Sequence, residues 1–378
     1  MRKNHILRFL FLFLVASAAI GQGTVKFLTI NVWSGLTYQG TFKTQAFESG
    51  EQRAFRYGLL VNELREIDAD VIALNEANML PGYAKRIARD LGYDYIYAVA
   101  RGGVRLGQVG FPFNLREGEV ILAKRYLNLT QLGSKGLQGG YAGNFASFHL
   151  HDATQALAGR ITVGEREVVV FNTMWHDALS PNRLGELVAL YDLGEIEGKG
   201  LLDRMRVSVE GKSIRMEEAE KTLLFVEELV GGSGARAPGA AATGAAAPGA
   251  ATSDAVDAGA TGEVHTGQSG AAVAVVLMGD LNAPPSSEEI ALLKASGLLD
   301  SWDDSAAPGY TWDEFTNTNI IKYHGDIGES RPLHRERMSY VFYRGVDINV
   351  VSSDLALDGS IYDIHPSDHY GVLVELEF

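Results

Sequence analysis

The sequence predicts an α/β fold in which strands and helices are stacked in layers. Short apolar runs alternate with longer segments of helical spacing, an order typical of layered α/β domains. The run at 273–278, Val-Ala-Val-Val-Leu-Met, is typical of a strand buried on both faces. Polar residues follow directly after several of these runs, so we expect a functional site along the strand ends.

The first half of the chain predicts alternating strands and helices. A strand at 25–30 precedes a helix at 52–67, in which Leu60 and Leu64 lie at helical spacing. A glycine-punctuated loop at 101–115 carries Phe111 and Phe113, and loops of this length are usually functional. The remaining predicted elements are a strand at 70–74, a helix at 83–91 and strands at 95–100, 119–123, 145–150, 160–163 and 167–171.

The second half contains an unusual segment at 231–270, which is composed almost wholly of Gly, Ala, Pro, Ser and Thr. Such a composition buries too little apolar surface to offset its ordering entropy, so we expect a disordered insertion within one domain. The predicted elements around it are helices beginning near 182 and spanning 216–230, then strands at 273–278, 337–343, 346–351 and 370–378.

The N-terminus has the order of a secretory signal peptide at residues 1–21. Arg2, Lys3 and Arg8 precede an apolar run at 9–15, and small residues follow it at 16–18. An uncleaved anchor is the alternative, although the run is short for a membrane span. We therefore expect a secreted or periplasmic protein whose folded domain covers 24–378.

Composition excludes two classes of exported protein. The chain has no cysteine, so neither a lipid-anchored lipoprotein nor a disulfide-stapled domain fits. Its 47 Asp and Glu against 33 Lys and Arg give a net charge of −14, which argues against avid nonspecific binding of nucleic acid. A local basic cleft is still compatible with this charge.

The polar residues at the strand ends suggest hydrolysis at phosphorus. Asp280 and Asn282 lie two positions apart, so both side chains leave the same face of an extended backbone. Glu76 is an oxygen ligand suited to Mg²⁺, and His176 and His369 are candidate acids or bases. Since the chain lacks a cysteine and a Gly-x-Ser-x-Gly motif, metal-assisted attack by water is the remaining chemistry.

An ordered series of short motifs resembles the endonuclease/exonuclease/phosphatase superfamily, which includes DNase I and the sphingomyelinases. The resemblance covers about residues 24–378 apart from the insertion. It implies a four-layer sandwich, two mixed β-sheets packed face to face with helices outside. The motifs are Ile30-Asn31, Leu74-Asn75-Glu76, Glu117-Gly118, Asn172-Thr173 with His176, Gly279-Asp280-Leu281-Asn282 and Ser367-Asp368-His369.

The resemblance also implies a role for each motif residue. Glu76 would hold the metal with Asn31 and Asp368 nearby, and Asn282 would donate a hydrogen bond to the phosphate. Asp280 or His369 would take the proton of the attacking water, an alternative that stays open. His176 would stabilise the transition state or assist the leaving group. Glu117 would orient His176, and Asn172 and Ser339 would orient other side chains of the site.

Two positions depart from the family pattern. Met174 stands where many relatives have the first histidine of Asn-Thr-His-Leu-His, so only the position of His176 is filled. Ser339 stands where relatives commonly have the aspartate that orients the catalytic histidine, and a hydroxyl brings no charge to that task. Both departures motivate an alternative hypothesis, a catalytically silent binding protein that retains the fold.

We expect an exported phosphodiesterase that uses Mg²⁺, with Mn²⁺ or Ca²⁺ as alternatives. The expected substrate is a phospholipid head group, as for a sphingomyelinase, or nucleic acid, in which case the chain is a secreted DNase. The loop at 101–113 is the segment expected to meet a membrane surface or a nucleotide. No feature of the sequence calls for an obligate protein partner.

Overall fold

A computed structural model describes residues 23–37, 45–102, 105–106, 109–110, 114–138, 146–147, 153–176, 214–231, 273–304, 307–323 and 333–378. The predicted signal peptide, the helix predicted near 182 and the insertion beyond Gly231 lie outside these residues. Within them, no helix has both the length and the apolar character needed to cross a membrane.

Two six-stranded sheets form the centre of the molecule. The first contains β1 (Thr24–Asn31), β2 (Val71–Ala77), β3 (Asp94–Gly102), β6 (Arg116–Ala123), β16 (Asn349–Ala356) and β17 (Gly371–Glu377), in the order β16-β17-β1-β2-β6-β3. The second contains β7 (Thr130–Gln138), β9 (Thr154–Val163), β10 (Arg166–Met174), β11 (Ala274–Asp280), β12 (Leu299–Asp300) and β15 (Ser339–Arg344), in the order β12-β15-β11-β10-β9-β7. Both sheets are mixed, because β1 with β2 and β10 with β11 are parallel while their other pairs are antiparallel.

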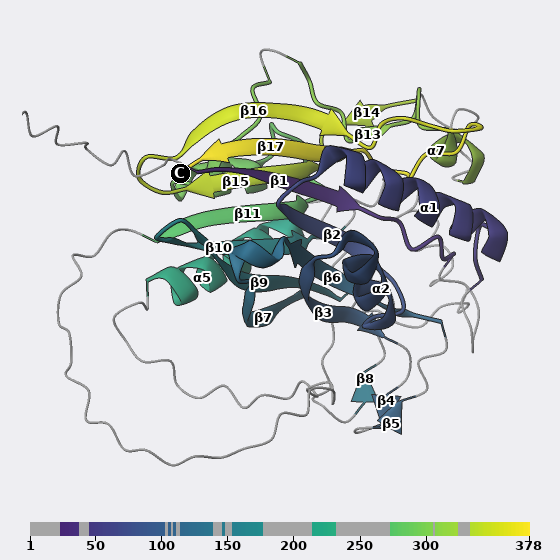
Figure 1. Cartoon of the computed structure of the whole chain (residues 1–378), viewed down its shortest axis with the longest axis horizontal. Coiled ribbons are helices and arrows are strands. Elements are labelled where there is room, and N and C mark those ends of the chain that lie inside the picture. Colours follow the sequence, from purple (N-terminus) through teal and green to yellow (C-terminus); the bar gives the residue numbers. More distant parts are fainter. Residues whose placement is uncertain are drawn as a thin grey trace, which may run out of the picture.

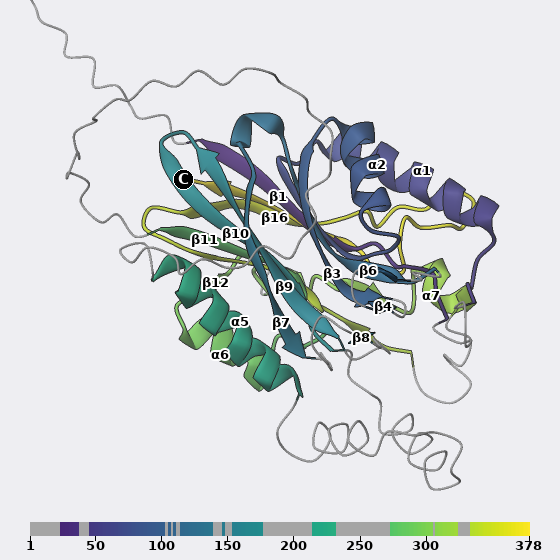
Figure 2. The ribbon, with the colours of Figure 1, turned by 90° about the horizontal axis from the view of Figure 1, so that it is seen from below.

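Helices cover the outer face of each sheet, and this confirms the predicted four-layer sandwich. Helices α1 (Gly50–Ile67) and α2 (Gly82–Leu91) pack on the first sheet, while α5 (Ile214–Val230) and α6 (Glu288–Ala295) pack on the second. Figure 1 shows α1 and α2 in front of the strands, and Figure 2 shows the two helix pairs on opposite sides of them.

The alternation of side chains along the strands explains these layers. In β1, Phe27 points into the core between the sheets, and its neighbour Leu28 points towards α1 and α2. In β11, Val276 lies in the inner core and Leu277 in the cluster under α5 and α6. The run at 273–278 is therefore buried on both faces, as its continuous apolar pattern predicts.

Several short elements differ from the predictions. Within the described part of the loop predicted at 101–115, β3 continues to Gly102, and the two-residue strands β4 (Arg105–Leu106) and β5 (Val109–Gly110) follow. These two strands form a small sheet with β8 (Ala146–Ser147), and the rest of the strand expected at 145–150 lies outside the described residues. Phe111 and Phe113 also lie outside the described residues. The strand expected at 346–351 begins only at Asn349, because Asp347 takes a left-handed backbone conformation in the preceding turn. The other short elements are η1 (Arg125–Leu127), β13 (Trp312–Asp313), α7 (Thr318–Tyr323) and β14 (Arg335–Glu336).

Candidate active site

The two parallel strand pairs bring the predicted site residues to one edge of the sandwich. In the first sheet Asn31 lies beside Asn75, and in the second Met174 lies beside Asp280. Because parallel strands end on the same side, the residues that follow each strand gather there.

Buried amides join the two sheets at this edge. Asn75 Nδ2 donates to Asn172 Oδ1 at 3.0 Å, and Asn172 Nδ2 donates to the carbonyl oxygens of Leu74 and Val120. Asn75 Oδ1 accepts a hydrogen bond from Asp280 N at 3.2 Å. An amide both donates and accepts without a charge, so it can be buried between sheets at lower desolvation cost than a carboxylate. Asn172 and Asn75 therefore hold the ends of the two sheets together through these hydrogen bonds.

Asn31 links the carboxylates of the two sheets. Its Nδ2 donates to Glu76 Oε1 and to Asp280 Oδ2, both at 3.0 Å, while its Oδ1 accepts from Trp33 N. Glu76 has φ 55° at an irregularity in the pairing of β2 with β6, and this turns its carboxylate towards the site. Ser34 N donates to the second oxygen of Glu76 at 3.2 Å.

Glu76 lies among other negative charges. Burial, followed by the charges of Glu117 and Asp368, raises the pKa of Glu76 to about 7, against the charge of Arg101 and the hydrogen bond from Asn31, which lower it. Asp368 is buried, and Ser367 Oγ lies 3.2 Å from its Oδ1. The predicted metal residues thus form a site of negative charge beside an amide.

His369 is buried next to Asp280. Its Nδ1 lies 3.7 Å from Asp280 Oδ2, and its ring meets the Trp312 ring edge-on at 4.9 Å between centroids. Among the described residues, neither His369 Nδ1 nor the buried Ser339 Oγ has a hydrogen-bond partner. Ser339 therefore makes no hydrogen bond to His369, and its position is set by the pairing of β15 with β11 opposite Asp280.

The carboxylate that contacts His176 is Glu218, not the predicted Glu117. Glu218 Oε1 lies 2.8 Å from His176 Nδ1, and its Oε2 accepts from His176 N at 2.9 Å. Glu117 instead forms an ion pair with Arg101 at 3.0 Å. The reason is the position of Glu117 on β6, where it faces β3 in the first sheet, whereas His176 follows a strand of the second sheet.

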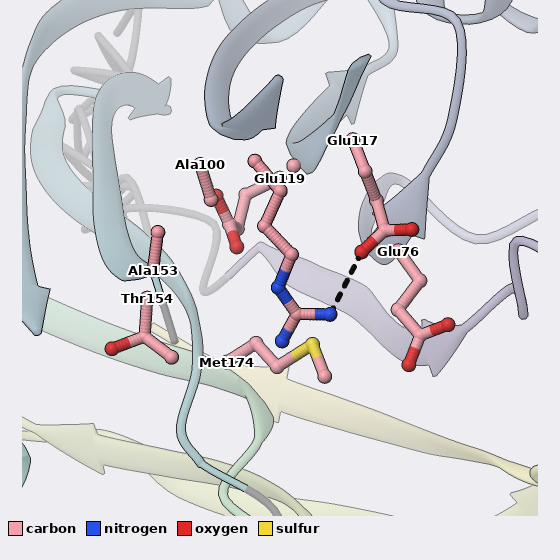
Figure 3. A pocket seen from close by; sticks show the side chains of 9 residues that line it. Glu76, Ala100, Glu117, Glu119, Ala153, Thr154 and Met174 are labelled. Atoms are coloured by element: carbon pink, nitrogen blue, oxygen red, sulfur yellow. Dashed lines mark hydrogen bonds and ion pairs between the residues drawn. The ribbon is translucent and has the colours of Figure 1, made fainter. Parts of the chain in front are cut away.

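A small pocket opens beside Glu76. Arg101 lies in its wall and is the one cation among its nine lining residues, which include three glutamates, at positions 76, 117 and 119. Figure 3 shows Glu76 and Glu117 on one side of this pocket and Ala153 and Thr154 on the other. Met174 also lines it. Arg101 belongs to none of the short motifs, and the sequence indicates only that it begins the loop expected to meet a membrane surface or a nucleotide.

Asn282 continues the site on the turn after β11. It has φ 48°, and its Nδ2 donates to Trp175 O at 2.9 Å. Arg215 on α5 donates to Asn282 O. The turn that carries Asn282 is thus attached both to the residue before His176 and to α5.

Arg56 on α1 holds the loop that follows Asn31 and the loop that contains Asp368. Its buried guanidinium donates to the carbonyl oxygens of Val32, Trp33 and Pro366 and pairs with Glu48 at 2.8 Å. The first two carbonyls follow Asn31, and the third precedes Asp368. Arg56 therefore ties the two loops to one helix.

Within the part of the chain described, no three His, Asp or Glu side chains are placed together to hold a metal ion. The donor set at the edge is nevertheless of the kind that Mg²⁺ prefers, since this ion usually takes one or two carboxylates and retains several waters. Glu76, Asp368 and the Asn31 amide fit that description.

Comparison with known proteins agrees with this architecture. The model of the Endonuclease/Exonuclease/phosphatase family matches residues 28–369. This chain belongs to that family. Family members are hydrolases of phosphoester bonds, so the fold supports hydrolysis of a phosphate ester. No curated protein matches the chain in sequence.

Solved structures share the fold at low sequence identity. A mannosyl-6-phosphatase of Bacteroides thetaiotaomicron is 15% identical, with a TM-score of 0.53, and the match covers 94% of this chain and 100% of that one. TDP2 of D. rerio, solved with a single-strand DNA product, is 13% identical, with a TM-score of 0.51 and coverage of 94% and 99%. Another family protein of Bacteroides thetaiotaomicron is 14% identical, with a TM-score of 0.53 and coverage of 94% and 98%.

Proposed function

We propose that this chain is an exported, metal-dependent phosphodiesterase that uses water as the nucleophile. The observation that carries the proposal is the Asn31 amide, which bonds Glu76 in the first sheet and Asp280 in the second. A metal-binding carboxylate and a proton-accepting carboxylate are thereby held at one point, where a phosphate would meet both. Membership of a family of phosphoester hydrolases supports the same reaction class.

Glu76 and Asp368, with Asn31 beside them, are the residues that would hold the divalent cation. Their mutual charge favours a cation, because the charge of Asp368 contributes to the raised pKa of Glu76. A bound Mg²⁺ would supply positive charge against the phosphate oxygens.

The neighbouring side chains can orient the phosphate and accept a proton. Asp280 and His369 lie 3.7 Å apart and are the two candidate acceptors for the proton of the attacking water. Asn282 uses one hydrogen of its amide for Trp175 O, and its second hydrogen can bond a phosphate oxygen. Arg101 places a guanidinium in the adjoining pocket, where it can contact a second phosphate oxygen.

We propose a phospholipid head group as the substrate. The net charge of −14 disfavours long-range attraction of nucleic acid. Two residues after Asn31, the Trp33 ring packs against two other aromatic rings. Its centroid lies 6.1 Å from that of Phe47 and 5.3 Å from that of Tyr323. Phe47 is 39% exposed, so this group offers an apolar surface beside the site. The single-strand DNA in the D. rerio structure makes nucleic acid the competing substrate to be tested.

The deciding experiment is hydrolysis of bis-p-nitrophenyl phosphate by the protein without residues 1–21, with and without Mg²⁺. We expect metal-dependent turnover that falls at least about 100-fold in Glu76→Gln and in His369→Ala, because each change removes a group that acts on the reacting phosphate. Glu165→Gln is the matched control, since Glu165 is exposed in the turn before β10, away from the strand ends that form the site.

Sphingomyelin vesicles and single-stranded DNA would then be compared at equal concentration of phosphodiester. Faster cleavage of sphingomyelin supports the lipid substrate, and faster cleavage of DNA would replace it with a secreted nuclease. Absence of turnover with Mg²⁺, Mn²⁺ and Ca²⁺ on all three substrates would contradict the enzyme and favour the silent binding protein.

A further inference from the structure

We propose that Glu218 is a positioning residue that holds His176 with its proton on Nδ1 and its Nε2 free to face the substrate. This inference rests on the proposed function, together with the role that the family resemblance implies for His176, at the transition state or the leaving group. Glu218 belongs to none of the motifs that identify the family, and it lies on a helix outside the two sheets.

The contacts of Glu218 define the orientation of His176. The carboxylate is fully buried, and a hydroxyl, a backbone N–H and the ring Nδ1 of His176 meet its two oxygens. Oε2 accepts from the backbone N of His176, while Oε1 meets the ring Nδ1 at 2.8 Å and accepts from the Thr154 hydroxyl. A ring and its own backbone held by one carboxylate leave the imidazole little freedom to rotate.

These contacts also determine the tautomer. An ionised carboxylate only accepts hydrogen bonds, so a contact of 2.8 Å requires the hydrogen on Nδ1. In the neutral ring, Nε2 then carries the lone pair. His176 can therefore accept a proton or a hydrogen bond at Nε2, and once protonated it can donate there to an ester oxygen.

The start of α5 connects this pair to the reacting residues. Arg215, three residues before Glu218, donates to Asn282 O and lies 3.7 Å from Glu289 on α6. Trp175, next to His176, donates from its backbone N to Asp280 O at 3.0 Å. The same helix turn thus braces the segment of His176 and the turn of Asn282, on the outer side of the second sheet.

A purely structural role for Glu218 makes a different prediction. A carboxylate that only attaches α5 to the end of β10 would affect stability when it is replaced, and the tautomer of His176 would not depend on it. The proton position on the ring is therefore the property that separates the two roles.

The test is ¹⁵N NMR of the full chain without residues 1–21, with labelled histidine and with the His176 signals assigned by their loss in His176→Ala. We expect a protonated Nδ1 and an unprotonated Nε2 in the wild type at neutral pH. In Glu218→Gln, one acceptor oxygen remains for three donors, so we expect the Nε2–H tautomer to grow. Glu228→Gln, an exposed change on the same helix at the Lys135 ion pair, should leave the signals unchanged.

Kinetics give the second readout. We expect Glu218→Gln to lower kcat about 10- to 100-fold with little change in KM, and to cause no further loss in the His176→Ala background, since it acts through that ring. Additive losses in the double variant would overturn the positioning role, as would an unaltered tautomer in Glu218→Gln.

The wild-type spectrum keeps the inference testable even where Glu218→Gln fails to fold. An Nε2–H tautomer in an active wild-type enzyme would overturn this inference alone. A wild type with the Nδ1–H tautomer and no turnover on any phosphodiester would overturn the proposed function, while the spectrum would still show how Glu218 places the proton.

Discussion

Glu119 is a buried carboxylate whose surroundings do not favour its charge. Burial raises the pKa of Glu119 to about 8, against hydrogen bonding from Gln155 and the charge of Arg101, both of which lower it. In the folded protein this carboxyl therefore keeps its proton above the pH at which an unfolded chain releases it. The resulting contribution to stability is lost as the pH rises from about 4.5 to about 8.

We expect Glu119→Gln to remove this loss. Relative to the wild type, its free energy of unfolding should be little changed at pH 4.5 and larger by as much as a few kcal/mol at pH 8.5, because the uncharged amide can still accept from Gln155 Nε2. Urea unfolding at both pH values measures the difference. Equal effects of the substitution at the two pH values would show that Glu119 is not protonated in the folded state.

β11 can carry Asp280 at its end only because Gly279 precedes it. Gly279 has φ 141°, and a Cβ added there would lie 1.8 Å from the carbonyl oxygen of Thr173 on β10. A side chain at this position would push the two parallel strands apart where Met174 and Asp280 are paired. The close approach of the strands is thus part of the site's geometry.

We expect Gly279→Ala to destabilise the fold by about 3 kcal/mol or more. Gly58→Ala is the matched control, because Gly58 lies inside α1 and an added Cβ there meets no atom within 4 Å. This control should stabilise the protein by about 0.5–1 kcal/mol. Thermal unfolding of the two variants measures both effects, and similar stabilities of the two would contradict the argument.

The segment at 231–270 connects two elements that both belong to the second half of the sandwich. α5 ends at Val230 and packs on the outer face of the second sheet, and β11 begins at Ala274 in the middle of that sheet. The described residues of these sheets and helices form the core clusters. We therefore expect the domain to need a connection here and no particular sequence for it.

We expect that a Gly/Ser linker of about ten residues can replace positions 231–270. Turnover of bis-p-nitrophenyl phosphate should stay within a few-fold of the wild type, and the temperature of unfolding should be nearly unchanged. The same replacement in the Glu76→Gln background controls for contaminating activity. A loss greater than 10-fold with unchanged stability would mean that the segment takes part in substrate binding.

Local patterns were sufficient for most of the framework. The strand at 273–278 is marked by a continuous apolar run and the helix at 52–67 by apolar residues at helical spacing. The structure has β11 at Ala274–Asp280 and α1 at Gly50–Ile67. By contrast, β7 (Thr130–Gln138) is an edge strand rich in glycine and polar residues, with little apolar alternation to indicate it. Its strand conformation depends on pairing with β9, which no local pattern encodes.

In the candidate site, too, local motifs indicated most of the residues, and one contact depended on tertiary packing. Asn31, Glu76, Asp280 and Asn282 lie at or directly after the ends of buried strands, and Asp368 and His369 lie just before β17. All six stand within short motifs, so the sequence was enough to select them as candidate site residues. The partner of His176 was not accessible in this way, because Glu218 lies 42 positions away on a helix and Glu117 has the more familiar motif. Hydrogen bonds between distant segments depend on how the layers pack, and packing is a property of the folded chain. The sequence therefore determined which strand ends carry the polar motif residues, and the fold decided which side chains meet there.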